Sequence, residues 1–193
     1  MVVLNRIYTR SGDDGTTALG TGERRKKYDL RIAAYGTLDE VNAVIGVARL
    51  HIAQHGPLGA QLGRIQNDLF DVEADLCMPS QQGKGPGGAR LAVSDVQVGW
   101  LEGEIDRLNG ELAPLKSFIL PGGNAAAAYL HLARTVCRRA ERIMVELNDQ
   151  PGETVTAAAL KYINRLSDFL FVASRFVNDK GAADLLWVPG QNR

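Results

Sequence analysis

The chain has 193 residues, of which 45% are hydrophobic and 23% charged, and its formal net charge is zero. This length suits one domain, and the balanced charge excludes a global attraction to nucleic acid or to a membrane surface. No apolar run reaches the roughly 20 residues that a membrane-spanning helix needs, and the first residues show no secretory leader pattern. We therefore expect one domain over residues 1–193 in a cytoplasmic protein, with Cys77 and Cys137 as reduced thiols.

The first distinctive segment covers residues 8–27, YTRSGDDGTTALGTGERRKK, and has almost no apolar side chains. Its glycines free backbone N–H groups, and its hydroxyl and cationic side chains add donors, so the segment could cradle phosphates. It lacks the G-x-x-x-x-G-K-[ST] spacing of a P-loop, and no predicted strand precedes it. A frayed N-terminal tail is the alternative interpretation.

Two amphipathic helices are predicted next. Thr37 and Glu40 form a capping-box pattern, so the first helix is expected to begin at Thr37 and to run to about residue 53. The second covers residues 58–78, and its apolar stripe consists of Leu62, Ile65, Leu69, Val72 and Leu76. A flexible loop is expected over residues 79–88, where glycine and proline dominate.

Three further helices complete the prediction. Ser94 with Gln97 is another capping-box pattern, and an extended linker follows the third helix over residues 113–123. Asn124 can cap a fourth helix that ends near Leu147, and the fifth runs from about Thr156 to Asn178 before an irregular tail. No series of strands is expected, so the predicted fold class is all-α: a single-domain five-helix bundle with the N-terminal loop against it.

The fourth helix separates its side chains into two arcs when residues are placed at 100° per step. The apolar arc consists of Leu132, Ala133, Val136, Cys137, Ala140, Ile143, Met144 and Leu147. The polar arc consists of Arg134, Arg138, Arg139, Glu141 and Arg142. Because the planar fork of arginine suits phosphate oxygens, this arc is either an anion clamp or a solvated outer face.

Five segments occur in one order that resembles the PduO-type ATP:cob(I)alamin adenosyltransferases: YTRSGDDGTTALGTGERRKKYD, AYGTLDEVNAVIG, FILPGG, RTVCRRAER and INRLSDFLFVASR. The resemblance covers residues from about Ile7 to Asn178. It implies a homotrimer with active sites between adjacent subunits. It also implies transfer of the 5′-deoxyadenosyl group of ATP to the cobalt of cob(I)alamin, with release of triphosphate. Mg²⁺ is implied with the ATP, a reductase supplies electrons to cob(II)alamin, and an adenosylcobalamin-dependent enzyme receives the product.

The same resemblance implies a nucleotide site. In the family, the N-terminal loop folds over ATP and becomes ordered when ATP binds. The loop residues implied to contact the nucleotide are Thr9, Arg10, Ser11, Gly12, Thr17 and Lys27, and the helical residues are Arg138, Arg139, Glu141, Arg142 and Asn164. Fixed cations there would stabilise the charge that develops on the leaving triphosphate, and positioning would hold C5′ in line with cobalt.

The resemblance implies catalytic roles for four residues: Asp39, Phe118, Arg134 and Arg138. The resemblance pairs Asp39 with Arg134 of a neighbouring subunit, although Asp39 could equally be an acid in the first turn of its helix. Phe118 is implied to displace the lower axial ligand of cob(II)alamin, and Phe169 to extend the apolar corrin pocket. Both phenylalanines could instead be core residues.

Three other classes of protein are alternatives to an adenosyltransferase. A metal–carboxylate bundle uses paired Glu-x-x-His motifs, whereas His51 and His55 are spaced i, i+4 and His131 has no ligand partner, so no protein metal ligand is expected. A nucleic-acid-binding module would need a basic excess and interleaved aromatic residues. A non-catalytic nucleotide-binding or cobalamin-carrying relative could share the same fold.

Overall fold

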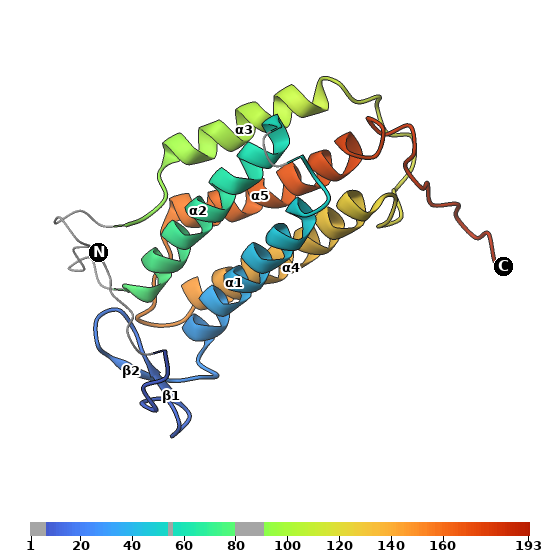
Figure 1. Ribbon diagram of the computed structural model, residues 1–193. Helices are drawn as coiled ribbons and strands as arrows, with labels where there is room; N and C mark the ends of the chain where they lie inside the picture. The colour runs from blue at the N-terminus through green and yellow to red at the C-terminus, as the bar shows by residue number, and fades with distance from the viewer. Residues whose placement is uncertain (1–6, 54–55, 80–90) are drawn as a thin grey trace.

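A computed structural model describes residues 7–53, 56–79 and 91–193 of the chain. Five helices form an elongated bundle (Figure 1): α1 (Leu30–Arg49), α2 (Pro57–Cys77), α3 (Asp95–Asn109), α4 (Ala125–Asn148) and α5 (Ala157–Phe176). This confirms the all-α prediction. The glycine-rich loop expected over residues 79–88 lies, apart from residue 79, outside the described residues.

One continuous hydrophobic core holds the helices together. Helix α1 packs against α2 and α4, and α5 packs against α3 and α4. The stripe predicted for the second helix is buried in this core as expected: Leu62, Ile65, Leu69, Val72 and Leu76. Each such side chain stabilises the fold by about 1.5–3 kcal/mol, because its apolar surface leaves water.

The predicted start of the first helix is wrong. Helix α1 begins at Leu30, and the side chain of Asp29 caps it by accepting a hydrogen bond from Arg31 N at 2.9 Å. Thr37 lies inside the helix, where its hydroxyl donates to the carbonyl of Ala33 at 2.7 Å. A hydroxyl that bonds the preceding turn cannot cap a new helix, so the Thr37–Glu40 pattern is accidental.

The other predicted helix starts are confirmed. Ser94 N donates to Gln97 Oε1 at 2.8 Å, which is half of the expected capping box. Asn124 Oδ1 accepts from the backbone N–H of Ala127 at 2.9 Å, and α4 follows directly. These side chains satisfy backbone donors that a helix leaves free at its N-terminus.

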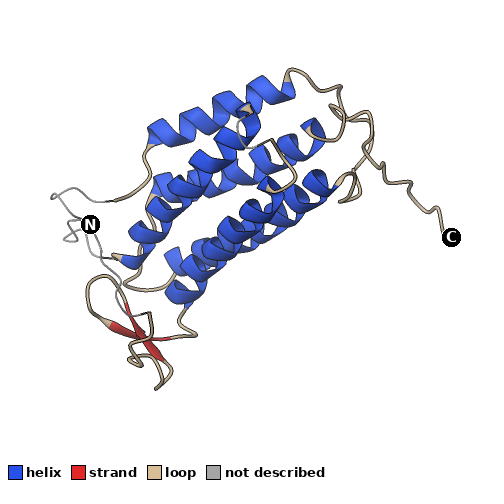
Figure 2. Cartoon of the chain, viewed as in Figure 1, coloured by secondary structure: helices blue, strands red, loops and turns tan. Residues whose placement is uncertain are grey.

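The N-terminal segment contains a short antiparallel hairpin of β1 (Thr16–Ala18) and β2 (Arg24–Lys26), at one end of the bundle (Figure 2). Arg25 Nη1 lies 2.9 Å from Glu153 Oε1 in the α4–α5 connection. The same carboxylate binds Arg31, whose buried guanidinium also donates to the carbonyl of Leu76 at 2.8 Å. The hairpin is therefore tied to the bundle, and the interpretation of this part of the segment as a frayed tail is wrong.

The linker before α4 and the C-terminal tail pair with each other. Leu120 N donates to Leu185 O at 2.7 Å, and Trp187 N donates to Phe118 O at 2.8 Å. The tail is otherwise irregular, as predicted. This pairing places the Trp187 and Phe118 rings edge to face, with their centroids 6.0 Å apart.

Within the described parts of the chain, no helix has both the length and the apolar character that crossing a membrane requires.

Candidate active site

The polar arc of α4 presents three exposed arginines, Arg138, Arg139 and Arg142, as the helical periodicity predicts. Arg139 pairs with Glu40 of α1, and Arg142 Nη1 donates to the carbonyl of Arg138 at 2.9 Å. The apolar arc is buried with one clear exception: Leu132 is 48% exposed, so its assignment to the core face is wrong. Several guanidinium groups thus gather along one open edge of α4, where an anion can reach them.

Glu141 and Asn164 are in direct contact, although they come from different helices. Asn164 of α5 donates through Nδ2 to Glu141 Oε1 of α4 at 2.7 Å. The other amide atom, Oδ1, accepts from Arg165 Nη1 at 2.6 Å. This bridge fixes the orientation of two predicted site residues beside the arginines.

The N-terminal residues implied to contact the nucleotide form a second cluster. The Thr9 and Ser11 hydroxyl oxygens are 2.8 Å apart, and Arg10 lies 5.6 Å above the Tyr8 ring. The φ of Arg10 is 63°, a left-handed conformation that costs an L-residue roughly 1–2 kcal/mol. A Cβ on Gly12 would lie 3.1 Å from Lys27 Nζ, so a larger residue there would push the lysine ammonium away by a few tenths of an ångström.

These two clusters are not bonded to each other within one chain. Among the described residues, no hydrogen bond or ion pair joins the implied loop contacts, which also include Thr17, to the arginines of α4. The loop stands at the end of the bundle where α1 begins, as Figure 1 shows. The structure therefore brings together each half of the predicted nucleotide site but does not join the halves.

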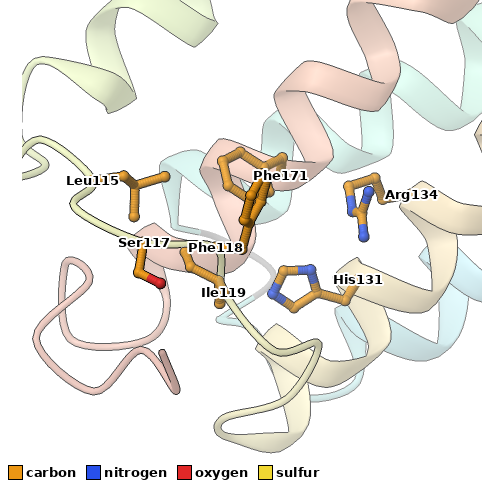
Figure 3. A pocket seen from close by; sticks show the side chains of 7 residues that line it. All are labelled: Leu115, Ser117, Phe118, Ile119, His131, Arg134 and Phe171. Atoms are coloured by element: carbon orange, nitrogen blue, oxygen red, sulfur yellow. The ribbon is translucent and has the colours of Figure 1, made fainter. Parts of the chain in front are cut away.

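A cavity of about 470 Å³ has Arg134 of the polar arc in its wall (Figure 3). The linker, α4 and α5 supply its walls, which consist of Leu115, Ser117, Phe118, Ile119, His131, Arg134 and Phe171. Phe118 is 77% exposed, so the alternative that it is a core residue is wrong. The cavity thus combines a mostly apolar wall with a few polar groups, which is typical of sites for organic ligands.

The two phenylalanines of the INRLSDFLFVASR segment have different environments. Phe169, expected at an apolar pocket, is instead fully buried in the core. Phe171 lines the cavity, and sequence reasoning missed it. Residues two apart on a helix point roughly 200° away from each other, so only the packing of α5 decides which ring faces the cavity.

Two polar residues of α4 face the same cavity. Arg134 is half-buried, and its pKa is lowered by burial and then by the charge of Arg138. His131 is 3% exposed, and burial, followed by the charge of Arg134, lowers its pKa below 6.5. The imidazole is therefore neutral at pH 7. Sequence reasoning missed His131, whose i, i+3 spacing from Arg134 was the available signal.

Asp39 is exposed on α1, but it does not lie in the first turn, because the helix begins nine residues earlier at Leu30. The alternative that it is a first-turn acid is therefore wrong. Among the described residues, no ion pair within the chain joins Asp39 to Arg134. Asp39 does act on Glu73 of α2: burial, and then the charge of Asp39, raises the pKa of Glu73 to about 7.

The histidines do not form a metal centre in the part of the chain that the structure describes. His51 is exposed and stacks on the Tyr129 ring at 5.4 Å, whereas His55 lies outside the described residues. No group of three or more His, Cys, Asp or Glu side chains among the described residues could hold a metal ion. The geometry gives no support to the metal–carboxylate bundle.

Comparison with known proteins gives one consistent result. The model of the cobalamin adenosyltransferase family matches residues 7–177. A corrinoid adenosyltransferase of Mycobacterium tuberculosis is 46% identical over 192 residues, which cover 100% of this chain and 97% of that protein. A variant of the PduO-type ATP:corrinoid adenosyltransferase from Lactobacillus reuteri, solved with cobalamin and ATP, superposes with a TM-score of 0.84 at 37% identity, covering 94% of this chain and 99% of that one.

Proposed function

The chain belongs to the cobalamin adenosyltransferase family, and we propose that it transfers the 5′-deoxyadenosyl group of ATP to the cobalt of cob(I)alamin. The products are adenosylcobalamin and triphosphate. The observation that carries the proposal is the position of the cavity, with exposed Phe118 at one wall and Arg134 at the other, beside the arginine edge of α4. An apolar surface for a corrin and a cationic surface for a polyphosphate therefore adjoin.

The proposed reaction is a nucleophilic displacement in which cobalt attacks C5′ of ATP and the triphosphate leaves. Arg138, Arg139 and Arg142 would bind the phosphates and stabilise the negative charge that grows on the leaving group. The Glu141–Asn164 bridge would orient the nucleotide beside them. Neither an acid nor a base is needed, so the protein contributes position and electrostatics, while the cobalt supplies the chemistry.

Phe118 and Phe171, which line the cavity, have a different proposed role. Phe118 would displace the lower axial ligand of cob(II)alamin, which leaves a four-coordinate cobalt that is easier to reduce to Co(I). Its exposed ring and its edge-to-face contact with Trp187 support this role, because they hold an apolar group at the open side of the cavity. Phe171 would take the place in the corrin pocket that the sequence suggested for Phe169.

The proposal includes a homotrimer whose sites lie between subunits. This arrangement is compatible with the described residues of one chain, in which no hydrogen bond or ion pair joins the loop cluster to the α4 arginines. The loop residues Thr9, Arg10, Ser11, Gly12, Thr17 and Lys27 would fold over ATP from one subunit and meet the arginines of the next. Asp39 and Arg134, which do not pair within the chain, would then form an ion pair across the interface.

The remaining partners follow from the reaction. Mg²⁺ would accompany the triphosphate, whose oxygens are the ligands it prefers, since it is usually bound by one or two carboxylates plus substrate phosphates. A separate reductase would supply the electron, and an adenosylcobalamin-dependent enzyme would accept the product. We propose that the chain acts as one domain in the cytoplasm.

An anaerobic turnover assay tests the proposal. Purified protein, MgATP and chemically reduced cob(I)alamin are mixed, the loss of the Co(I) absorbance is followed, and the products are separated by chromatography. The proposal predicts adenosylcobalamin and triphosphate in equal amounts over many turnovers. ATP binding without adenosyl transfer would contradict it and would favour the carrier interpretation.

A further inference from the structure

His131 and Arg134 each have an unsatisfied polar atom beside the same cavity. The Nδ1 of His131 and the Nε of Arg134 are both buried and have no hydrogen-bond partner. The two residues lie three apart on α4, a spacing that makes their side chains neighbours, and Figure 3 shows both at one wall of the cavity. The His131 Nδ1 can accept a hydrogen bond, and the Arg134 Nε can only donate one, so the two atoms are complementary.

The tautomer of His131 follows from its neighbour on α5. The hydroxyl of Ser174 donates its only proton to the carbonyl of Phe171 at 2.7 Å. The contact between Ser174 Oγ and His131 Nε2 at 3.2 Å must therefore have the imidazole as donor. In the neutral ring the proton is on Nε2, which leaves the Nδ1 lone pair free to accept.

The surroundings keep this imidazole neutral. The linker residues that face it across the cavity are uncharged: Leu115, Ser117, Phe118 and Ile119. From α5 it meets Ser174 and the edge of the Phe171 ring. Within the described part of the chain, the charge of Asp184 acts on it, and Arg175 binds that carboxylate at 2.9 Å. The nearby cation is Arg134 itself, which opposes a second positive charge.

We propose that His131 is a positioning residue for Arg134: its Nδ1 accepts a hydrogen bond from the guanidinium in the assembled site and fixes the direction of that charge. A hydrogen bond between them would satisfy both buried atoms at once, which removes the cost of leaving them unpaired. The inference rests on the proposed function, because Arg134 is the residue proposed to pair with Asp39 of a second copy.

Two substitutions distinguish the contributions of the two ring nitrogens of His131. His131→Gln retains a polar atom near the Nε2 position and loses the acceptor at Nδ1, whereas His131→Asn places an oxygen near the Nδ1 position. We expect His131→Gln to lower kcat about tenfold, the loss expected for a hydrogen bond to a charged group, with KM for ATP and cobalamin within about twofold of wild type. His131→Asn should recover most of kcat. The matched control is His51→Gln, an exposed histidine, which should leave kcat unchanged.

The pH profile is a second readout. Protonated His131 would repel Arg134 and could no longer accept its hydrogen bond. Wild-type kcat should therefore fall as the pH drops below 6.5 and through the lowered pKa of His131, and His131→Asn should lack this decline. Equal kcat and equal pH profiles in wild type and His131→Gln would overturn the inference. So would a selective rise in KM for cobalamin, which would mark direct contact with the corrin.

A measurement without turnover keeps the inference testable if a variant fails to fold. ¹⁵N NMR of the wild-type protein, with the His131 ring signals assigned by through-bond correlation to its own backbone resonances, reports the tautomer. The expected spectrum at pH 7.5 has Nε2 protonated and Nδ1 bare, and a proton on Nδ1 would overturn the inference. Failure of the proposed function would instead appear as wild-type protein with this tautomer but no adenosyl transfer.

Discussion

At the scale of single residues, phosphate binding depends on which arginines are already ion-paired within the chain. Arg139 is paired with Glu40, and Arg31 is buried against Glu153. Arg138, by contrast, is exposed on the open edge of α4. The most exposed cations of a cluster are the ones that can change partner without disturbing the core, so they are the best candidates for binding phosphate.

Arg138→Ala should therefore lower the activity without lowering the stability of the fold. We expect at least a hundredfold loss in kcat/KM, because a fixed donor to the leaving triphosphate is removed, while the melting temperature changes little. Steady-state kinetics and thermal unfolding on the same preparation provide the measurement. Arg107→Ala, a surface arginine of α3 that pairs with Glu104, is the control and should change neither quantity. Near-normal turnover of Arg138→Ala would contradict its role as a phosphate clamp.

Glu73 gives a prediction with a defined dependence on pH. Its folded-state pKa is raised to about 7 by burial and then by Asp39, so its contribution to stability is present below pH 4.5 and is lost as pH rises through 7. Glu73→Gln should gain about 1 kcal/mol in unfolding free energy, relative to wild type, between pH 5 and pH 8.5. Urea unfolding at one protein concentration measures this gain. A gain independent of pH, or one matched by the exposed Glu146→Gln, would contradict the assignment.

The residues that sequence reasoning missed differ in the signal that the sequence held for them. The polar arc of α4 could be predicted, because helical periodicity alone sets which side a residue faces. Phe171 could not be predicted, because its place depends on how α5 and the linker pack against α4, whereas the spacing of His131 from Arg134 was a local signal that the helical pattern did contain. The wrong placement of Leu132 has the same origin as the omission of Phe171: it lies at the edge of the apolar arc, where only the neighbouring elements decide exposure.

At the scale of elements, the hairpin and its anchor determine how the glycine-rich segment can act. Arg25 and Arg31 share the Glu153 carboxylate, and Gly20 N donates to the carbonyl of Cys77 at 2.9 Å. These contacts fix β1 and β2, while Thr9 and Ser11 remain exposed at the other end of the segment. A fixed base with an exposed tip suits a loop that closes over a ligand.

Glu153→Gln should weaken this anchor strongly. It leaves the buried guanidinium of Arg31 without its counter-charge, and we expect a destabilisation of about 3 kcal/mol near pH 7. Burial tends to raise the pKa of Glu153, but the hydrogen bonds and charges of Arg31 and Arg25 outweigh it and lower the pKa. The stabilisation is therefore present above pH 4.5 and is lost as pH falls through the folded pKa.

Chemical denaturation of Glu153→Gln and of a control tests this prediction. Glu23→Gln breaks an ion pair of Arg25 at the surface and should cost less than about 1 kcal/mol. The difference between the two variants should shrink as the pH falls below 4.5. Equal effects of the two substitutions at pH 7 would mean that Glu153 does not anchor the hairpin.

The N-terminal segment should also respond to nucleotide. The exposed part of the segment that precedes the anchored hairpin, residues 8–15, should be cleaved by protease in the free protein and protected in the presence of MgATP, since the loop is proposed to fold over the triphosphate. Limited proteolysis with mass spectrometry measures the protection. Equal cleavage in both states would contradict closure of the segment over the nucleotide.

Element prediction succeeded where the signal was local. The side chains of Asn124 and Gln97 cap their helices by accepting backbone N–H groups, and the structure confirms both predicted starts. The start of α1 was missed because Asp29 is a cap without a Glu or Gln three residues later, while a stronger pattern at Thr37 lay inside the helix. The pairing of the tail with the linker joins segments far apart in sequence, so no local pattern could predict it.

At the scale of the whole molecule, we propose that the active site is divided between two copies of the chain. Among the described residues of one copy, no hydrogen bond or ion pair joins the loop cluster to the arginines of α4, and none joins Asp39 to Arg134. Closed cyclic assembly of identical chains solves both problems at once, because each copy then offers its loop to one neighbour and its α4 edge to the other. The proposed homotrimer is one such closed ring, and the number three comes from the family resemblance.

The most direct test of a shared catalytic site is complementation between two inactive chains. Asp39→Ala and Arg134→Ala are each expected to abolish adenosylcobalamin formation when assembled alone. Co-expressed with different tags and purified as mixed trimers, they should regain about a third of wild-type activity, because in each mixed trimer about one interface in three carries both intact residues. Mixed assemblies as inactive as either parent would contradict a site built from two copies of this chain.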